Sequence, residues 1–147
     1  MKVLAVDPGE KRIGLAVSDP TGTIARPLRV LIHEARAEDA KQIVAAALAE
    51  DARMIVVGQP LDADGTVGPQ ARKSQRLAEA IGLETDLPVH LWDESGTTDA
   101  AIRSRIALGT SRKKRHGHLD DLAASILLQD FLIQNETLVH DEDSIDE

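Results

Sequence analysis

Three short apolar runs, each followed by a glycine or an acidic residue, constrain the fold of this chain more than any other feature. They lie at Val3–Val6, Met54–Val57 and Pro88–Trp92. Apolar runs of this length that end at turn residues are typical of strands buried in a sheet. A segment with apolar residues at helical spacing precedes the second run, so we expect parallel strands joined by helices.

Two further strands are expected at Ile13–Ser18 and Ile24–Ile32, and with the first run they would form an antiparallel meander. Pro27 favours an edge position for the third strand, because proline cannot donate to a central ladder. Helices are expected at 38–50, from after Gly68 to about 81, from 97 toward 108, and at 119–133. The prediction is an α/β fold with a five-stranded mixed sheet, three antiparallel strands then parallel strands, and helices on both faces.

A chain of 147 residues suits one compact domain, which we place at residues 1–134. Residues 135–147 hold six of the 25 acidic residues and no Lys or Arg, so we expect an acidic, disordered tail. The tail could compete with nucleic acid for basic residues, or it could be a solvating extension only. Without it the chain is close to neutral, so the formal charge of −8 does not exclude a nucleic-acid partner.

The composition excludes several classes of function. The absence of cysteine excludes disulfides, thiolate zinc sites and a cysteine nucleophile. The first residues meet a charge and a Pro-Gly turn too early for a signal peptide, and no apolar run approaches membrane-spanning length, so we expect a cytoplasmic protein. Trp92 and Phe131 are the only Trp, Tyr or Phe residues, which argues against a base-stacking platform and favours recognition through backbone and shape.

Acidic residues follow two of the apolar runs. Asp7 comes directly after the first, and Glu94 follows the third. Functional groups in open α/β sheets gather beyond the carboxyl ends of strands, so we expect these two carboxylates to meet. Each residue alone is also common in turns and loops, and only their convergence indicates chemistry.

A third carboxylate is expected from the last helix, where helical spacing chooses between two neighbours. The positions three, four, seven and eleven residues after Asp120 are all apolar, which places it on the sheet-facing stripe. The same steps from Asp121 reach a face that includes Ser125. The pattern favours Asp120 modestly and leaves Asp121 as an alternative.

Three converging carboxylates repel one another unless protons or cations lie between them. Hard oxygen ligands suit Mg²⁺ or Mn²⁺, and a pair of such ions can align water for in-line displacement at a phosphodiester. We therefore predict a site for Mg²⁺ or Mn²⁺, with two ions, held by Asp7, Glu94 and Asp120.

Basic residues occur beside two of these acids. Lys11 and Arg12 lie in the turn after Asp7, in a strand-turn-strand context that excludes both a P-loop and a dinucleotide fingerprint. A glycine-flanked segment before Asp120 is expected to form a mobile loop that contacts phosphate groups. Its basic residues are Arg112, Lys113, Lys114 and Arg115. His116 and His118 are expected to be solvated or to contact phosphate, so neither belongs to the catalytic set.

Four spaced motifs resemble the YqgF/RuvX family, whose members are named for pre-16S rRNA processing or Holliday junction resolution. The blocks are Asp7 to Asp19, Val56 to Gln70, Asp93 to Thr98, and Asp120 to Gln129. The resemblance covers about residues 1 to 134 and implies an RNase H-like fold with divalent-metal nuclease chemistry. It places the family's acidic residues on Asp7, Glu94 and Asp120, and its first-motif Lys and Arg on Lys11 and Arg12.

Two positions depart from the family pattern. Pro8 stands where Val or Phe is common, and it gives an Asp-Pro-Gly turn similar to that of RuvC resolvases. Ser95-Gly96 replaces the usual Arg-Leu pair after Glu94, which puts the substrate contact of that loop in doubt.

The sequence predicts a metal-dependent endonuclease that cleaves structured nucleic acid. The favoured cellular role is 5′-end processing of pre-16S rRNA. The alternative is a Holliday junction resolvase that acts on four-way DNA junctions as a dimer, because junction cutting pairs two active sites by symmetry. A lower-ranked alternative is a non-catalytic RNA-binding or regulatory protein. The sequence leaves open both the choice between RNA and DNA and the choice between monomer and homodimer.

Overall fold

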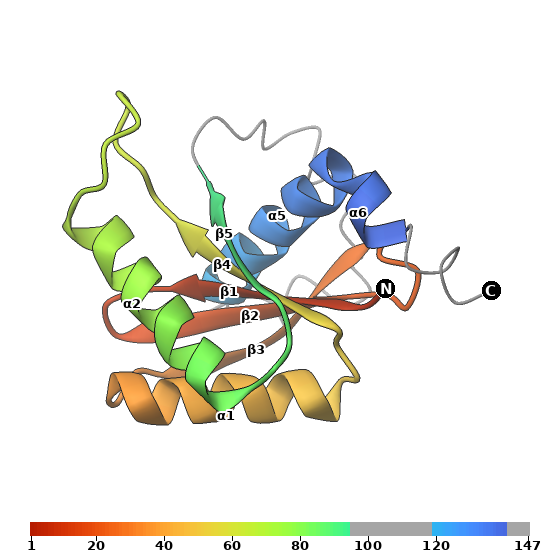
Figure 1. Ribbon diagram of the computed structural model, residues 1–147, viewed down its shortest axis with the longest axis horizontal. Helices are drawn as coiled ribbons and strands as arrows, with labels where there is room; N and C mark the ends of the chain where they lie inside the picture. Colours follow the sequence, from red (N-terminus) through yellow and green to blue (C-terminus); the bar gives the residue numbers. More distant parts are fainter. Residues whose placement is uncertain (95–118, 141–147) are drawn as a thin grey trace.

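The computed structural model describes residues 1–94 and 119–140, except for the side chains of residues 119–121. Five strands form one mixed sheet in the order β3-β2-β1-β4-β5 (Figure 1). Their bounds are β1 Val3–Pro8, β2 Arg12–Ser18, β3 Ala25–Ile32, β4 Met54–Gln59 and β5 Val89–Asp93. The pairs β1–β2 and β2–β3 are antiparallel, whereas β1–β4 and β4–β5 are parallel. The predicted five-stranded mixed sheet is confirmed.

The central strands β1 and β4 are buried on both faces, which explains their unbroken apolar runs. In β1, Val3 and Ala5 enter one hydrophobic core, whereas Leu4 and Val6 enter the other. Successive side chains of a strand point to opposite faces of the sheet, so the two cores lie on opposite sides. Pro27 lies in the edge strand β3, opposite Ala16 and beside an irregularity in the register, as a proline in a sheet requires.

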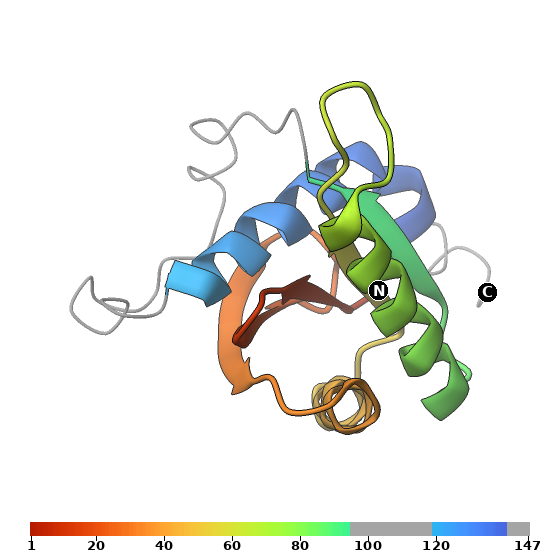
Figure 2. The ribbon, with the colours of Figure 1, turned by 90° about the vertical axis from the view of Figure 1, so that its left-hand side faces the viewer.

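Helices cover both faces of the sheet. Helices α1 (Arg36–Ala49) and α2 (Pro69–Glu84) pack on one face, with Ile43 and Ile81 in its core. Helix α5 (Leu119–Gln134) packs on the other face, mainly against β1, β2 and β3. Figure 2 looks along the sheet and shows α1 and α2 on one side of the β1–β2 hairpin and α5 on the other.

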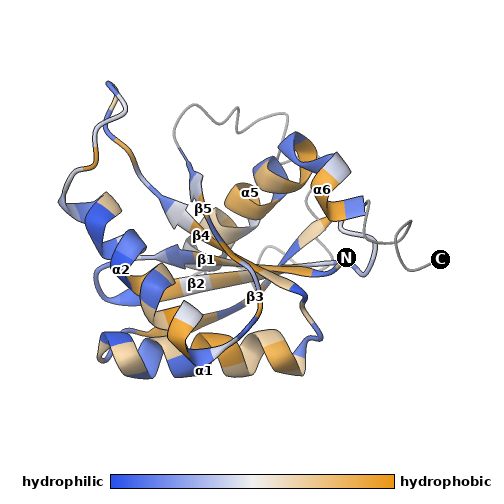
Figure 3. Cartoon of the chain, viewed as in Figure 1, coloured by the Kyte–Doolittle hydropathy of each residue, from blue (hydrophilic) through white to orange (hydrophobic). Residues whose placement is uncertain are grey.

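The two helical layers differ in polarity. Figure 3 shows α5 as mostly hydrophobic, whereas much of α2 is hydrophilic. In α5 both Gln129 and Ser125 are buried together with the apolar side chains, because the helix lies across three strands. In α2 only one stripe is buried, and it contains Leu77 and Ile81. The exposed polar side of α2 is therefore available to solvent or to a polar ligand.

Residues 136–140, expected to belong to a disordered tail, instead form the short helix α6 (Glu136–His140). Val139 is completely buried, and its carbonyl oxygen accepts a hydrogen bond of 3.0 Å from the amino group of Met1. Composition alone did not indicate this buried residue, because the segment from 135 to 147 is rich in acidic residues. Residues 141–147, the helix expected from 97 toward 108 and the basic loop lie outside the described residues.

None of the helices in the described part of the chain has the length and apolar character that a membrane span requires.

Candidate active site

Asp7 lies at the carboxyl end of β1, where the central strand reaches the edge of the sheet. Alternation along β1 places its side chain on the same face as Val3 and Ala5, which is the face covered by α5. Gly14 lies opposite Asp7 in the antiparallel pair with β2. The strand continues to Pro8, so Asp7 lies within its last two residues rather than after it, at the edge of the sheet where the sequence predicted this carboxylate.

Glu94 directly follows β5, at the same edge of the sheet. Its backbone N–H donates to the carbonyl oxygen of Gln59 at 3.3 Å, which ties it to the end of β4. The carboxyl groups of Glu94 and Asp7 are hydrogen-bonded to each other. Two of the three predicted acids thus converge, although they come from strands separated by β4.

Gly58 explains how two carboxylates meet across an intervening strand. The register pairs Val6 with Val57 and Gly58 with Trp92, so Gly58 lies between Asp7 and the end of β5. A Cβ atom on Gly58 would lie only 2.4 Å from Oε1 of Glu94 and 2.9 Å from Cδ2 of Leu127. The glycine therefore leaves the space that the Glu94 carboxyl group occupies.

The pKa of Glu94 is raised from 4.5 to about 8. The largest cause is partial burial of the carboxyl group, followed by repulsion from Asp7, their hydrogen bond and repulsion from Asp93. At neutral pH the Asp7–Glu94 pair therefore holds one proton between its carboxyl groups when no cation is present. A divalent cation would replace that proton, so this oxygen donor set fits a hard metal ion.

The third predicted acid, Asp120, lies in the first turn of α5, but its side chain and that of Asp121 are outside the description. The burial pattern along α5 does not decide which of the two acids faces Asp7 and Glu94. Leu127, seven residues after Asp120, lies beside Gly58, whereas Ala123 on the same stripe is exposed. The stripe that begins at Asp121 is fully buried at its next four positions. Among residues whose side chains are described, no cluster of three metal-ligating groups occurs.

Lys11 and Arg12 lie in and directly after the β1–β2 turn, and both are exposed. Gly9 closes this turn by donating its N–H to the carbonyl oxygen of Arg12 at 2.9 Å. A Cβ atom at Gly9 would lie 2.6 Å from that oxygen, so the tight turn requires glycine here. In the sequence, the two cations follow Asp7 at the same turn. The other predicted contacts, Arg112, Lys113, Lys114 and Arg115, lie outside the described residues.

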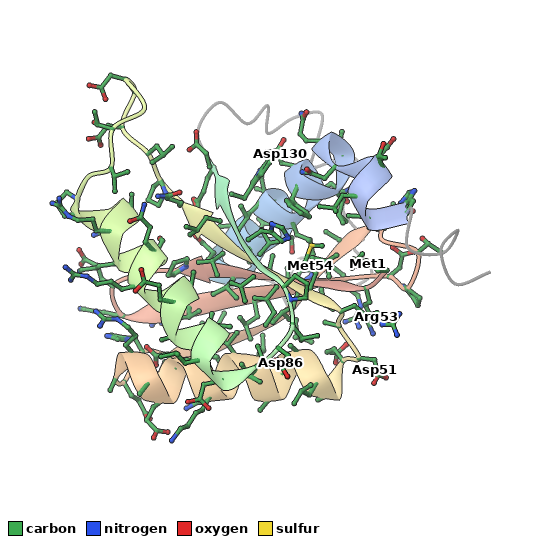
Figure 4. The ribbon with its side chains drawn as sticks, in the orientation of Figure 1. Met1, Asp51, Arg53, Met54, Asp86 and Asp130 are labelled. Atoms are coloured by element: carbon green, nitrogen blue, oxygen red, sulfur yellow. The ribbon has the colours of Figure 1, made fainter. Side chains whose placement is uncertain are left out.

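Two features of the site are absent from the sequence-based prediction. Gly58 appears in the sequence only as the end of an apolar run, and its position between two acids becomes visible only in the register. Trp92 donates its indole N–H to Oδ2 of Asp130 at 2.8 Å and makes an edge-to-face contact with Phe131. Asp130, labelled on α5 in Figure 4, thereby ties the end of β5 to that helix.

Comparison with known proteins gives a consistent result. A family model described as RuvX, Holliday junction resolvase, matches residues 1–134. A Halothermothrix orenii protein named "Putative pre-16S rRNA nuclease" is 38% identical over 132 residues, which cover 90% of this chain and 94% of that protein. A protein of the same name from Geobacillus sp. is 42% identical over 134 residues, covering 90% and 97%.

Solved structures support the fold. RuvC of T. thermophilus in complex with a Holliday junction substrate superposes with a TM-score of 0.60 at 18% identity, over 93% of this chain and 97% of that one. The fowlpox virus Holliday junction resolvase superposes with a TM-score of 0.57 at 15% identity, over 91% and 99%. At these identities the superpositions establish the RuvC-like, RNase H-like fold alone.

Proposed function

This chain belongs to the RuvX family, and from that membership and its paired carboxylates we propose that it is a divalent-metal-dependent endonuclease that hydrolyses phosphodiester bonds of structured nucleic acid. The observation that carries the proposal is the hydrogen-bonded pair Asp7–Glu94, which meets across Gly58 at the carboxyl edge of the sheet. A structural ion pair would match an acid with a base, whereas this site brings two acids together at a cost in repulsion.

Asp7 and Glu94 are the residues that would hold the metal, with Asp120 as the proposed third ligand. When bound, Mg²⁺ or Mn²⁺, as a pair of ions, supplies a polarised water and stabilises charge on the phosphate. The protein holds the carboxylates in place before the metal arrives, because Asp7 is fixed by the sheet and Glu94 by its bond to Gln59. Glu94, whose pKa is raised to about 8, would have to lose its proton to act as a ligand.

The substrate that we favour is precursor 16S rRNA at its 5′ end, in the cytoplasm. The names of relatives with about 40% identity over nine tenths of this chain support this choice. The second candidate substrate is the four-way DNA junction, which the description of the matching family supports. Junction cleavage would require a homodimer, whereas rRNA processing would be compatible with a monomer.

A cleavage assay with Asp7→Asn tests the proposal. Precursor rRNA, single strands and four-way junctions are incubated side by side with Mg²⁺ or Mn²⁺. We expect Asp7→Asn to lose cleavage of the preferred substrate by about a hundredfold or more, because it removes a charged metal ligand. The matched control is Asp86→Asn, an exposed residue that precedes β5 at the end opposite Glu94 (Figure 4).

The control is expected to cleave as the unmodified protein does. Equal cleavage by Asp7→Asn would refute the mechanism. Tight binding of RNA without cleavage, by both the unmodified protein and Asp7→Asn, would instead support the non-catalytic alternative.

A further inference from the structure

A pocket of about 360 Å³ lies where the β1–β2 turn meets the start of α1 and one side of α2. Its volume is in the range of small-ligand sites in proteins. Ile13 and Leu77, both buried, contribute apolar lining, whereas three cations contribute charge. The cations are Arg36 from α1 and Lys73 and Arg76 from α2.

The three cations are exposed and have no anionic partner among the residues that the structure describes. In contrast, Arg26 and Lys2 both contact Glu50 within 3.3 Å elsewhere on the surface. Three unpaired cations around one pocket repel one another, and an anion in the pocket would relieve that repulsion. The arrangement therefore favours an anionic ligand.

The two acids that also line the pocket are already engaged. Asp39 is buried at 3% exposure, contacts Nδ1 of His33, and accepts the backbone N–H of Glu34 at 3.0 Å. The carboxylate of Glu10 accepts a hydrogen bond of 3.2 Å from the amide of Gln70. Neither acid is within ion-pair distance of the three cations.

The start of α1 adds to the positive character of the pocket. Ala35 and Arg36 line it, and Ala35 caps the helix without a side-chain hydrogen bond. The first backbone N–H groups of a helix lack intrahelical partners and carry partial positive charge. An oxygen-rich anion beside Arg36 would therefore meet backbone donors as well as cationic side chains.

We propose that this pocket binds a phosphate group of the nucleic-acid backbone, as a contact separate from the cleavage site; the proposal rests on the proposed nuclease function. Pro8 lines the pocket on the face of α1 and α2, whereas alternation along β1 places Asp7 on the face of α5, so the two sites lie on opposite faces of the sheet. Figure 2 shows these helices on either side of the β1–β2 hairpin. A nucleic acid that reaches both must pass the turn that carries Lys11. Pro8 directly follows Asp7 in β1, so the pocket and the cleavage site flank the same turn.

Binding measurements on the full chain test this proposal. Fluorescence anisotropy with a labelled four-way junction and a labelled rRNA stem is recorded in EDTA, from 50 to 200 mM salt. For the variant Lys73→Gln/Arg76→Gln we expect about tenfold weaker binding to the preferred nucleic acid, the loss expected for one charge-assisted contact. The slope of log K against log salt should become shallower by about one, because one phosphate contact is lost.

The matched control is Arg29→Gln/Lys41→Gln, which removes the same charge from exposed residues outside the pocket. It should bind almost as the unmodified protein does. Equal weakening of both variants would overturn the proposal in favour of general electrostatic attraction, and no weakening of the pocket variant would also overturn it.

A titration with inorganic phosphate and with a nucleoside monophosphate, followed by NMR, distinguishes the source of the phosphate. Saturation of the pocket below millimolar concentration, with no effect of the pocket variant on nucleic-acid affinity, would assign the pocket to a free phosphate compound and overturn the proposal. Cleavage by Asp7→Asn tests the nuclease function separately, because the binding assay requires no cleavage.

Discussion

Gly58→Ala adds one methyl group at the point where the two carboxylates meet. The added Cβ would lie 2.4 Å from Oε1 of Glu94, whereas ordinary contacts begin at 3.4 Å. The Glu94 carboxyl group must therefore move by about 1 Å or more. A displacement of about 1 Å in a catalytic group can lower the rate about a hundredfold, and we expect a loss of that size in kcat.

The same methyl group would lie 2.9 Å from Leu127, so the variant also strains the packing of α5. Overpacking of a core costs about 1–3 kcal/mol in the free energy of unfolding. Activity should therefore be measured well below the melting temperature of the variant, with single-turnover cleavage under saturating metal. Thermal unfolding of the same sample shows which fraction is folded.

Gly82→Ala is the matched control, since it makes the same chemical change in α2, where an added Cβ would have no neighbour within 4 Å. It should leave cleavage unchanged and stabilise the protein by about 0.5–1 kcal/mol, as replacement of glycine within a helix does. If Gly58→Ala is folded and cleaves as fast as Gly82→Ala, the space at Gly58 does not position Glu94.

Glu94 gives two further predictions, and the buried Gln129 gives a third. In metal-free protein, unfolded Glu94 ionises near 4.5 while the folded residue keeps its proton to about 8, so its contribution to stability falls as the pH rises between these values. Glu94→Gln should flatten that decline in urea unfolding measured at several pH values, and an unchanged pH profile would contradict the raised pKa. Calorimetric titration with Mn²⁺ at pH 7 in two buffers should show proton release that Glu94→Gln abolishes, and equal release by both proteins would argue against displacement of the shared proton. Gln129→Leu should lower the free energy of unfolding by about 2–4 kcal/mol, because it strands the buried N–H of Ala25 and weakens the bonding of Thr23, whereas Gln134→Leu on the same helix is exposed and should change little.

Most of the sheet could be predicted because its central strands are apolar on both faces and end at clear turns. The predicted bounds of β1, β3 and β4 differ from the structure by at most two residues at either end. Helix α2 continues to Glu84, three residues past its expected end near Ile81, although its last turn is exposed. Helix α6 could not be predicted from composition. The segment is acidic, and the burial of its residue Val139 depends on contacts with distant parts of the chain.

The candidate site was predictable only in part. Asp7 and Glu94 could be found because an acid directly after a buried strand is a local pattern that leads to a known edge of the sheet. The role of Gly58 depends on which strand lies between β1 and β5, and strand order is not encoded in any local pattern. The cationic pocket was missed for the same reason, since Arg36 and Lys73 are far apart in the sequence and look like ordinary helix-surface residues.

The formal charge of −8 is compatible with a nucleic-acid substrate because charge acts locally in salt solution. At physiological ionic strength the Debye length is about 8 Å, so acids on distant surfaces are largely screened from a phosphate in the pocket. The cations that line the pocket are Arg36, Lys73 and Arg76. Its two acids are engaged, Asp39 by His33 and Glu10 by Gln70. Alternation along β1 keeps Asp7 on the other face of the sheet, where a cation would offset its repulsion. On one side of the β1–β2 turn the cations of the pocket would attract the proposed substrate. On the other side, a bound metal ion would offset the repulsion between its phosphate and Asp7.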